Sequence, residues 1–438
     1  MSASNDIKTL LDIQDKNINI EENTIEIKPF KGNMSKFITA KLTYKPTHCE
    51  CCGTINTDYT VYKNGTKTSR ITLPTSGVYP TYLRLKKQRF YCKSCRKSFS
   101  AKTSIVRDHC FISDHTKAKI LVESTNAQSL TDIAKSCIVS PTTVQRIISK
   151  EAKNYQPYYH ALPKHLSLDE FKYAKSQMAF EYVDACTGEI IDILDRRDGR
   201  TLKEHFIGNY LRNHLQDVET VTIDMNAGYV SVIKEVFPKA RIIIDRFHLV
   251  QLISRAMNKT RIRVMNTLKT SNGEDMKKYR RLKRYWKLLL KYERDLSHTE
   301  YKQYPLFGQR LEASVVQELL AYDVGLKVNY TLYQKLLTSM KEKDFQTLQD
   351  TLLNVKSSDI SSYMKTSIKT LKKHLPFIEN SFLYSYNNGR IEGINNKIKV
   401  LNRVSYGYRN FRNFKNRIML HFKLRAVINQ KESLSPVA

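Results

Sequence analysis

The sequence lacks any run of 18 apolar residues, and its first residues contain no basic segment followed by an apolar one. The first absence argues against a membrane-spanning helix, and the second argues against a secretory signal peptide. Acidic residues are also scarce: 42 Asp and Glu stand against 73 Lys and Arg, a net charge of +31. We therefore expect a cytoplasmic protein with no membrane partner that binds a polyanion, most simply nucleic acid. The alternative is a merely soluble or ribosomal-type basic protein.

Cysteine is uncommon and unevenly placed, because five of the 8 cysteines lie between positions 49 and 95. This clustering suits a metal site in a reducing compartment better than a disulfide framework. The two Cys-x-x-Cys pairs are Cys49 with Cys52 and Cys92 with Cys95. Their spacing predicts a four-thiolate zinc ribbon, with Cys51 as an alternative ligand in the first pair. Asn64 and Gly65 predict a hairpin turn between the pairs.

The segment SLTDIAKSCIVSPTTVQRIISK is typical of a helix-turn-helix. Ile138 marks the turn, and Ser140 is suited to cap a second helix with Pro141 at its first position. The apolar residues of that helix point to a core, which leaves a polar face for a DNA major groove. The residues expected on this face are Thr142, Thr143, Gln145 and Arg146. An ordinary helical hairpin is the alternative.

The stretch from residue 221 to 251 reads as strand, helix, strand, a βαβ unit. Asp224 ends its first strand and Asp245 its second, with His248 three residues further on. Three strands and a helix precede it, starting with LSLDEF, which contains Asp169. The order β-β-β-α-β-α-β is that of a ribonuclease-H-like α/β fold. In open α/β sheets the chemistry lies at the carboxyl ends of strands.

Beyond this unit the pattern is helical, with no glycine between Gly273 and Gly308. We interpret residues 251–379 as an all-helical insertion in the catalytic core; a separate C-terminal helical domain is the alternative. Glu392 then lies early in a helix that has Asn395, Asn396 and Lys399 on the same face.

A basic and aromatic segment follows Glu392. Its candidate DNA-binding residues are Lys397, Lys399, Arg403, Arg409 and Arg412, interleaved with Tyr406, Tyr408, Phe411 and Phe414. Cations neutralise phosphates and aromatic rings stack on bases, the composition of a nucleic-acid strand channel. The alternative is an amphipathic terminal helix with a solvated basic face.

Asp169, Asp224 and Glu392 together suggest a metal site for phosphodiester chemistry. Cleavage and strand transfer need two magnesium or manganese ions rather than a protein nucleophile, and such ions prefer carboxylates. Any single acid in such a chain is more often a strand-end cap or a solvated residue. Their positions at the ends of apolar strands and on a polar helix face favour the metal site.

The segments LSLDEF, TIDMNAGY, DRFHLVQ and NGRIEGINNKIK…YGYRNF resemble DDE transposases of bacterial insertion sequences, specifically the ISL3 group. The resemblance covers nearly the whole chain. It implies that Asp169, Asp224 and Glu392 are the metal-binding triad. Asp245 and His248 match an Asp-x-x-His pattern of related DDE enzymes, so His248 is expected to contact the scissile phosphate or the flanking strand; a structural histidine at the start of a helix is the alternative. The doubled Cys51–Cys52 and the long gap between cysteine pairs depart from the family pattern.

The resulting hypothesis is a nucleoid-associated transposase that binds double-stranded inverted-repeat ends and target DNA as a homodimer or larger assembly. The alternatives are a non-catalytic zinc and helix-turn-helix regulator on an inactive core, and a structure-selective nuclease. The expected domains are a lead-in (1–40), zinc ribbon (41–112), helix-turn-helix (113–152), ribonuclease-H-like core (160–250 and 380–425) and helical insertion (251–379).

Overall fold

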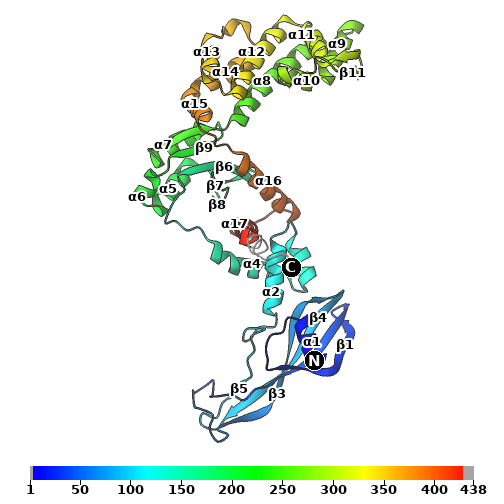
Figure 1. The fold of residues 1–438 in the computed structure, drawn as a ribbon, viewed down its shortest axis with the longest axis vertical. Helices are drawn as coiled ribbons and strands as arrows, with labels where there is room; N and C mark the ends of the chain where they lie inside the picture. The colour runs from blue at the N-terminus through cyan, green and yellow to red at the C-terminus, as the bar shows by residue number, and fades with distance from the viewer. Residues whose placement is uncertain (1–2, 226, 428–438) are drawn as a thin grey trace. The chain divides into compact units, whose positions relative to one another are not determined.

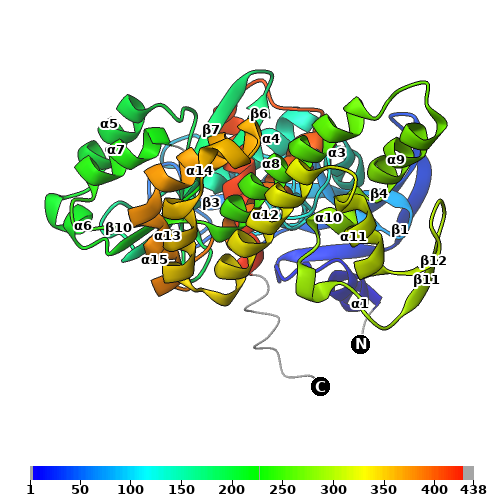
Figure 2. The same ribbon diagram turned by 90° about the horizontal axis from the view of Figure 1, so that it is seen from above.

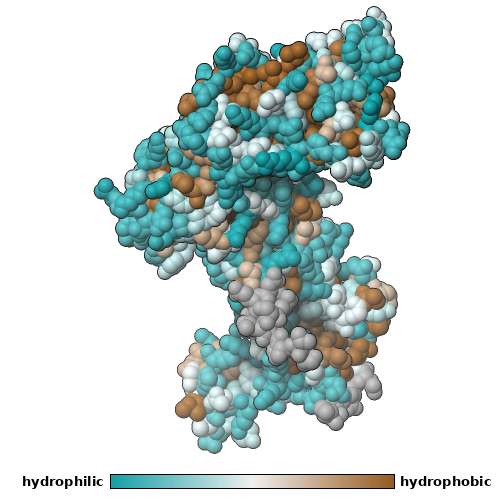
Figure 3. Space-filling model, turned by 45° about the horizontal axis from the view of Figure 1, so that its top comes forward, coloured by the Kyte–Doolittle hydropathy of each residue, from teal (hydrophilic) through white to brown (hydrophobic). Residues whose placement is uncertain are grey.

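The computed structural model describes residues 3–225 and 227–427 (Figure 1). The chain divides into two compact units, and each is described by itself below. The first unit comprises residues 1–156 and 397–438, and the second comprises residues 157–396. No helix in the described part of the chain is long and apolar enough to cross a membrane. Hydrophilic side chains cover most of the face that Figure 3 shows.

After α1 (Ala3–Leu10), the first unit contains a five-stranded sheet that includes residues from the lead-in, for which the sequence predicted no structure. The strands are β1 (Ile18–Phe30), β2 (Asn33–Leu42), β4 (Tyr79–Cys92) and β3 (Val61–Ser76) in spatial order, with β5 (Ser98–Ser100) pairing with β4. β2 and β4 are parallel, and the other pairs are antiparallel. The buried side chains of β1 and β2 form one core with Cys49 and Cys92. The lead-in and the cysteine pairs therefore belong to one folded module.

The predicted turn at Asn64–Gly65 is wrong in its position. β3 continues through these residues, and the hairpin to β4 turns after Ser76, which pairs with Tyr79. At Asn64 and Gly65 the register shifts, because Lys63 pairs with Phe90 and Thr66 with Gln88. Gly65 has φ +70°, so the dipeptide forms a bulge. The backbone conformation that suits a tight turn is here used within a strand.

Three helices follow the sheet: α2 (Asp114–Ser124), α3 (Leu130–Cys137) and α4 (Pro141–Glu151). Ile138 ends α3 in the left-handed conformation, and the Ser140 hydroxyl accepts from the Thr143 N–H at the start of α4. The sequence predicted the turn at Ile138 and the helix cap at Ser140, and the structure has both. Leu420, which follows α17 (Phe411–Met419), is buried among the same three helices. The end of the described chain thus completes their core.

The second unit contains a mixed sheet of five strands (Figure 1). Its spatial order is β10 (Arg241–Ile244), β9 (Thr220–Ile223), β6 (His165–Ala174), β7 (Gln177–Asp184) and β8 (Ile190–Leu194). β6, β9 and β10 run parallel to one another, and β6, β7 and β8 form an antiparallel meander. The apolar faces of α5 (Gly199–Asn209) and α7 (Ala227–Val236) pack into the core of this sheet.

The insertion starts with α8 (Arg246–Thr267), against which α12 (Val324–Glu342) and α14 (Ser362–Lys373) pack (Figure 2). The prediction that it is all helical is wrong, because β11 (Tyr301–Tyr304) and β12 (Gly308–Leu311) form a hairpin. Short alternating polar segments carry little strand signal when neither face is buried.

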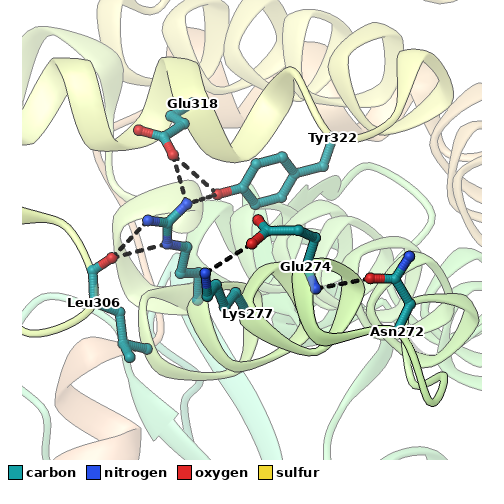
Figure 4. A network of polar contacts seen from close by, with 7 residues as sticks. Asn272, Glu274, Lys277, Leu306, Glu318 and Tyr322 are labelled. Atoms are coloured by element: carbon teal, nitrogen blue, oxygen red, sulfur yellow. Dashed lines mark hydrogen bonds and ion pairs between the residues drawn. The ribbon is translucent and has the colours of Figure 1, made fainter.

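A network of polar contacts holds this hairpin to the helices. Arg281 donates from Nε (2.9 Å) and Nη2 (2.7 Å) to the Leu306 carbonyl, and from Nη1 to Glu318 at 2.7 Å (Figure 4). Tyr322 accepts from the same guanidinium at 3.1 Å. The hairpin turn is thereby linked to α9 (Gly273–Arg284) and α11 (Glu312–Leu320).

The insertion returns to the sheet through α15 (Leu375–Leu383), which packs along the edge strand β10. Asn380 Nδ2 donates to the Ile242 carbonyl at 2.8 Å, and the Ser381 hydroxyl donates to the Ile244 carbonyl. These contacts satisfy carbonyls that an edge strand otherwise exposes. α16 (Gly389–Val404) begins six residues after α15 ends. The insertion therefore places the start of α16 beside the same sheet that α8 leaves.

Candidate active site and nucleic-acid interface

Four acids lie at one level across neighbouring strands of the second unit. Glu181 on β7 pairs directly with Asp169 on β6. Ser167 pairs with Thr222, so the same register sets Asp169 level with Asp224. Ile244 pairs with Ile223, which sets Asp245 level with Asp224. Strands lie about 4.8 Å apart, so this register concentrates carboxylates in a small space.

The sequence predicted Asp169 at the end of its strand, but the structure places it in the middle of β6. β6 continues to Ala174 because it pairs with β7, whereas its parallel pairing with β9 stops at Ser167. Asp169 Oδ1 accepts from the Glu170 N–H and Oδ2 accepts from Asn395 Nδ2, both at 2.8 Å. Burial raises the pKa of Asp169 to about 6, and the charge of Asp224 also raises it. Burial thus penalises the ionised form of Asp169, and a nearby cation would offset that penalty.

Glu181 was missed by sequence reasoning. It is 0% exposed, and neither carboxylate oxygen has a hydrogen-bond partner among the residues that the structure describes. Burial, together with the charge of Asp169, holds the pKa of Glu181 well above its ordinary value. Its position on an apolar strand, with a buried aromatic residue on either side, carries no signal that distinguishes it from a solvent-facing Glu.

Asp245, His248 and Glu392 form a cluster of two carboxylates and one imidazole in this unit. One ligand atom from each lies within 4.8 Å of the other two. His248 Nε2 is 3.6 Å from Glu392 Oε1. A pocket of about 280 Å³ beside them is lined by Asp224, Met225, His248, Gln251, Leu252 and Arg255. The residues from α8 in this lining recur every three or four positions, so they share one helix face.

Asp169, Asp224, Glu392 and His248, the four candidate catalytic residues, thus lie around one region of the second unit. Asp169 is joined to Glu392 through Asn395, which is on the same helix as Glu392. Asp224 shares the pocket with His248.

The four predicted zinc ligands converge in the first unit: Cys49, Cys52, Cys92 and Cys95. Cys49 and Cys95 sulfurs are 3.7 Å apart, and those of Cys52 and Cys92 are 3.8 Å apart. Tetrahedral coordination with bonds of about 2.3 Å separates sulfurs by about 3.8 Å. Hydrogen bonds from Thr54 lower the pKa of Cys52 to about 6, so a thiolate forms readily there. The cluster supports a structural zinc ion.

Cys51, the alternative ligand, is exposed and does not belong to this cluster. Its backbone N–H instead donates to the Cys49 sulfur at 3.4 Å. Such a bond stabilises a thiolate without adding a ligand.

The predicted groove-facing residues of α4 lie on its outer surface, where Thr142 and Arg146 are exposed. Two others already have partners: the Thr143 hydroxyl contacts Ser140 at 3.0 Å, and Gln145 Nε2 donates to Ser149 at 3.0 Å. A groove of about 530 Å³ at the start of α4 is lined by Ser140 and Thr143, together with Lys31 and Arg70 from the sheet. Cations from the sheet thus stand beside the start of α4.

The five basic candidates after Glu392 are all exposed: Lys397, Lys399, Arg403, Arg409 and Arg412. The aromatic residues among them differ in exposure. Tyr406 is 97% exposed, whereas Phe414 is fully buried and stacks on Tyr408 with the ring centroids 4.7 Å apart. Phe414 is therefore a core residue rather than a base-stacking one. Arg417 is also buried, and its Nη2 donates to the carbonyls of Asn126 (3.0 Å) and Gln128 (3.1 Å).

Comparison with known proteins identifies the family of the chain. Residues 166–418 match the family model of ISL3 DDE transposases, described as "Transposase". Residues 45–95 match the model described as "zinc-finger of transposase IS204/IS1001/IS1096/IS1165". The first match covers more than half of the chain and includes Asp169, Asp224, His248 and Glu392. The chain belongs to the ISL3 family of transposases.

Two curated relatives are similar to the chain. The "Transposase for insertion sequence element IS1001" of Bordetella parapertussis is 25% identical over 341 residues, which is 76% of this chain and 79% of the relative. An "ATP-dependent protease" of Lactococcus lactis subsp. lactis is 39% identical over 118 residues. That second match spans 27% of this chain and 37% of the relative.

Proposed function

We propose that this protein binds the terminal inverted repeats of an insertion sequence and catalyses metal-dependent DNA cleavage and strand transfer. The observation that carries the proposal is the register that sets Asp169 level with Asp224, with Asn395 of the Glu392 helix hydrogen-bonded to Asp169. The strand order, with β6 beside β9 and the insertion between β10 and α16, supports a ribonuclease-H-like core. The family match supports the same reaction class.

The donor set fits magnesium or manganese, since these cations prefer carboxylate oxygens. Asp169, Asp224 and Glu392 would hold them. When bound, such ions polarise the scissile phosphate and activate water or a 3′-hydroxyl. The raised pKa of Asp169 is consistent with this role, because a buried carboxylate without a cation resists ionisation.

The chain's own residues would position the DNA strand. Gln251 and Arg255 share with His248 one face of α8, which lines the pocket beside Asp224. A guanidinium and an amide at this place suit the phosphates that flank the scissile bond. Asn395 would hold the α16 backbone against β6, and so fix the distance between Glu392 and Asp169.

For the first unit we propose that α3 and α4 act as a helix-turn-helix, with Thr142 and Arg146 toward the major groove. Lys31 and Arg70 beside the start of α4 would contact the adjacent backbone. Because two element ends must be joined, the active form is proposed to be a homodimer or larger assembly on DNA.

Cleavage of end-labelled DNA that carries the repeats flanking the gene tests the catalytic site. We expect nicking at the repeat boundary with Mg²⁺ or Mn²⁺, and its loss in Asp224→Ala and Glu392→Ala while binding persists. Asp217→Ala and Glu379→Ala alter exposed acids and serve as matched controls that remain active. Cleavage that survives both site variants would place the active site elsewhere. Specific binding without cleavage would indicate a non-catalytic regulator.

Salt dependence of binding tests the DNA surface. The logarithm of the binding constant falls linearly with the logarithm of the salt concentration. Removing one cation that contacts a phosphate reduces the magnitude of this slope by about 0.9. We expect this for Arg403→Ala and Arg409→Ala, and no change for Lys239→Ala, which removes an exposed charge from the second unit. Arg146→Ala is expected to reduce the preference for the repeat over unrelated DNA. Unchanged slopes in both arginine variants would remove this segment from the interface.

A further inference from the structure

We propose that Asp245, His248 and Glu392 form a divalent-cation site of their own, in which the imidazole of His248 is a direct ligand. An imidazole nitrogen would coordinate this ion in addition to carboxylate oxygens. The site would therefore favour Mn²⁺ over Mg²⁺. The inference rests on the proposed function only through Glu392, which both ligand sets share.

The first reason is that Asp245 is buried without a capping hydrogen bond from its side chain. It is 4% exposed, so its carboxylate has lost most of its hydration. It occupies the N-cap position of α8, yet its side chain makes no capping hydrogen bond. The Asn388 N–H donates to Asp245 Oδ1 over a long distance of 3.4 Å. A helix-capping role therefore does not account for this buried acid.

The spacing of the three groups is the second reason. Around an octahedral ion with bonds of about 2.1 Å, neighbouring ligand atoms are about 3 Å apart and opposite ones about 4.2 Å apart. The separation of 3.6 Å between His248 Nε2 and Glu392 Oε1 lies in this range and is too long for a good hydrogen bond. All three groups offer ligand atoms within 4.8 Å of one another. A small contraction would bring them onto one ion.

Asn388 supplies a third, independent observation. It is 0% exposed and immediately precedes α16, the helix of Glu392. Neither its Oδ1 nor its Nδ2 has a hydrogen-bond partner within the described ranges, although its backbone contacts Asp245. Buried amides are nearly always hydrogen-bonded, and an exception requires an explanation such as an ion or its water. A hydrated cation at the cluster would provide one, because the Asn388 backbone already contacts Asp245.

The ligand types decide which cation fits. Mg²⁺ is bound almost entirely through oxygen, whereas an imidazole suits Mn²⁺ less well than Zn²⁺ but better than it suits Mg²⁺. One nitrogen and two carboxylates therefore select for transition ions. Asp169 and Asp224 offer carboxylate oxygens, so the two cation sites would have different metal preferences within one catalytic region.

Pulsed EPR of Mn²⁺ bound to the full-length, zinc-loaded protein without DNA tests the proposal. A directly bound imidazole produces ¹⁴N modulation of the Mn²⁺ signal. We expect that modulation in the wild type, its loss in His248→Gln, and its persistence in His298→Gln, which changes an exposed histidine. Asp245→Asn is expected to weaken Mn²⁺ binding by more than about tenfold, the loss that even an outer-shell partner causes.

Two results would overturn the inference: bound Mn²⁺ without ¹⁴N modulation in the wild type, or modulation that persists in His248→Gln. Labelling the wild type with ¹⁵N-histidine must replace the ¹⁴N modulation with ¹⁵N modulation. This experiment tests the ligand even where a variant fails to fold. The proposed function can fail separately. Absence of DNA cleavage would leave the nitrogen coupling in place, whereas cleavage without coupling would reject the histidine ligand alone.

Discussion

Asn395 donates from Nδ2 to Oδ2 of Asp169 at 2.8 Å, across 226 residues of sequence. Asn395 is 5% exposed and lies one turn after Glu392 on α16. The bond therefore connects the strand that carries one candidate metal ligand to the helix that carries another. The two partners lie on either side of the insertion in the chain.

Removing this bond is expected to impair cleavage without impairing DNA binding. We predict that Asn395→Leu lowers the cleavage rate by about 10- to 100-fold, the effect typical of groups that orient metal ligands. The same bond lowers the pKa of Asp169, so the acid limb of the pH–rate profile should move to higher pH. Asn396→Leu, at an exposed neighbour, is the control. Equal rates for the two variants would contradict an orienting role.

Arg417 is predicted to stabilise the first unit rather than to bind DNA. Arg417→Met removes two hydrogen bonds from a charged donor and leaves the Asn126 and Gln128 carbonyls without it. We expect a loss of about 2–4 kcal/mol in the free energy of unfolding. Arg412→Met changes an exposed arginine on the same helix and should alter stability by less than about 0.5 kcal/mol. Urea denaturation followed by circular dichroism compares the two, and similar midpoints would reject the assignment.

His421 should make the first unit sensitive to acid. It is 4% exposed, and burial lowers its pKa to about 4. An unfolded histidine titrates near 6.5, so the unfolded state binds more protons between these values. The contribution of His421 is therefore complete above about pH 6.5 and is lost as pH falls toward 4, up to about 3 kcal/mol.

The matched pair His421→Phe and His298→Phe measures this effect. Unfolding free energies between pH 7 and pH 4.5 should fall less steeply for the first variant than for the wild type. His298 is exposed, so its replacement should leave the slope unchanged. Identical slopes for all three proteins would show that His421 does not titrate on unfolding.

The zinc content of variants should show that Cys52, and not Cys51, is a zinc ligand. The four converging sulfurs include Cys52 but not Cys51. We expect purified wild type and Cys51→Ser to release one zinc ion per chain on thiol modification, and Cys52→Ser to release essentially none. The Cys52 variant should also lose protection from proteolysis around residues 47–57, since zinc binding and local folding are coupled. Full zinc content in Cys52→Ser would show that another group replaces it.

Local signals in the sequence sufficed wherever one short segment determines its own conformation. Ser140 and Pro141 start α4, Ile138 ends α3, and the two Cys-x-x-Cys pairs supply the four sulfurs. Each of these depends on bonds between residues a few positions apart, or on a motif with one chemical use. The family resemblance rested on such segments, and the family match agrees with it.

Other features depended on burial that no local pattern records. Arg417 and Phe414 belong to a basic and aromatic segment, yet the structure buries both. The edge strands β11 and β12 and the bulge at Gly65 likewise follow from pairing rather than from composition. Which members of a basic segment meet solvent is decided by the helices that pack against it.

The sequence by itself determined the chemistry available to this protein: four thiolates for zinc, carboxylates that follow apolar strands, and a large excess of positive charge. Tertiary structure alone decided which of those groups meet. The register of β6, β9 and β10 sets Asp169, Asp224 and Asp245 level, and the insertion returns α16 so that Glu392 faces His248. Strand pairing and helix packing act between residues far apart in the chain, and a pattern within a short segment cannot encode their partners.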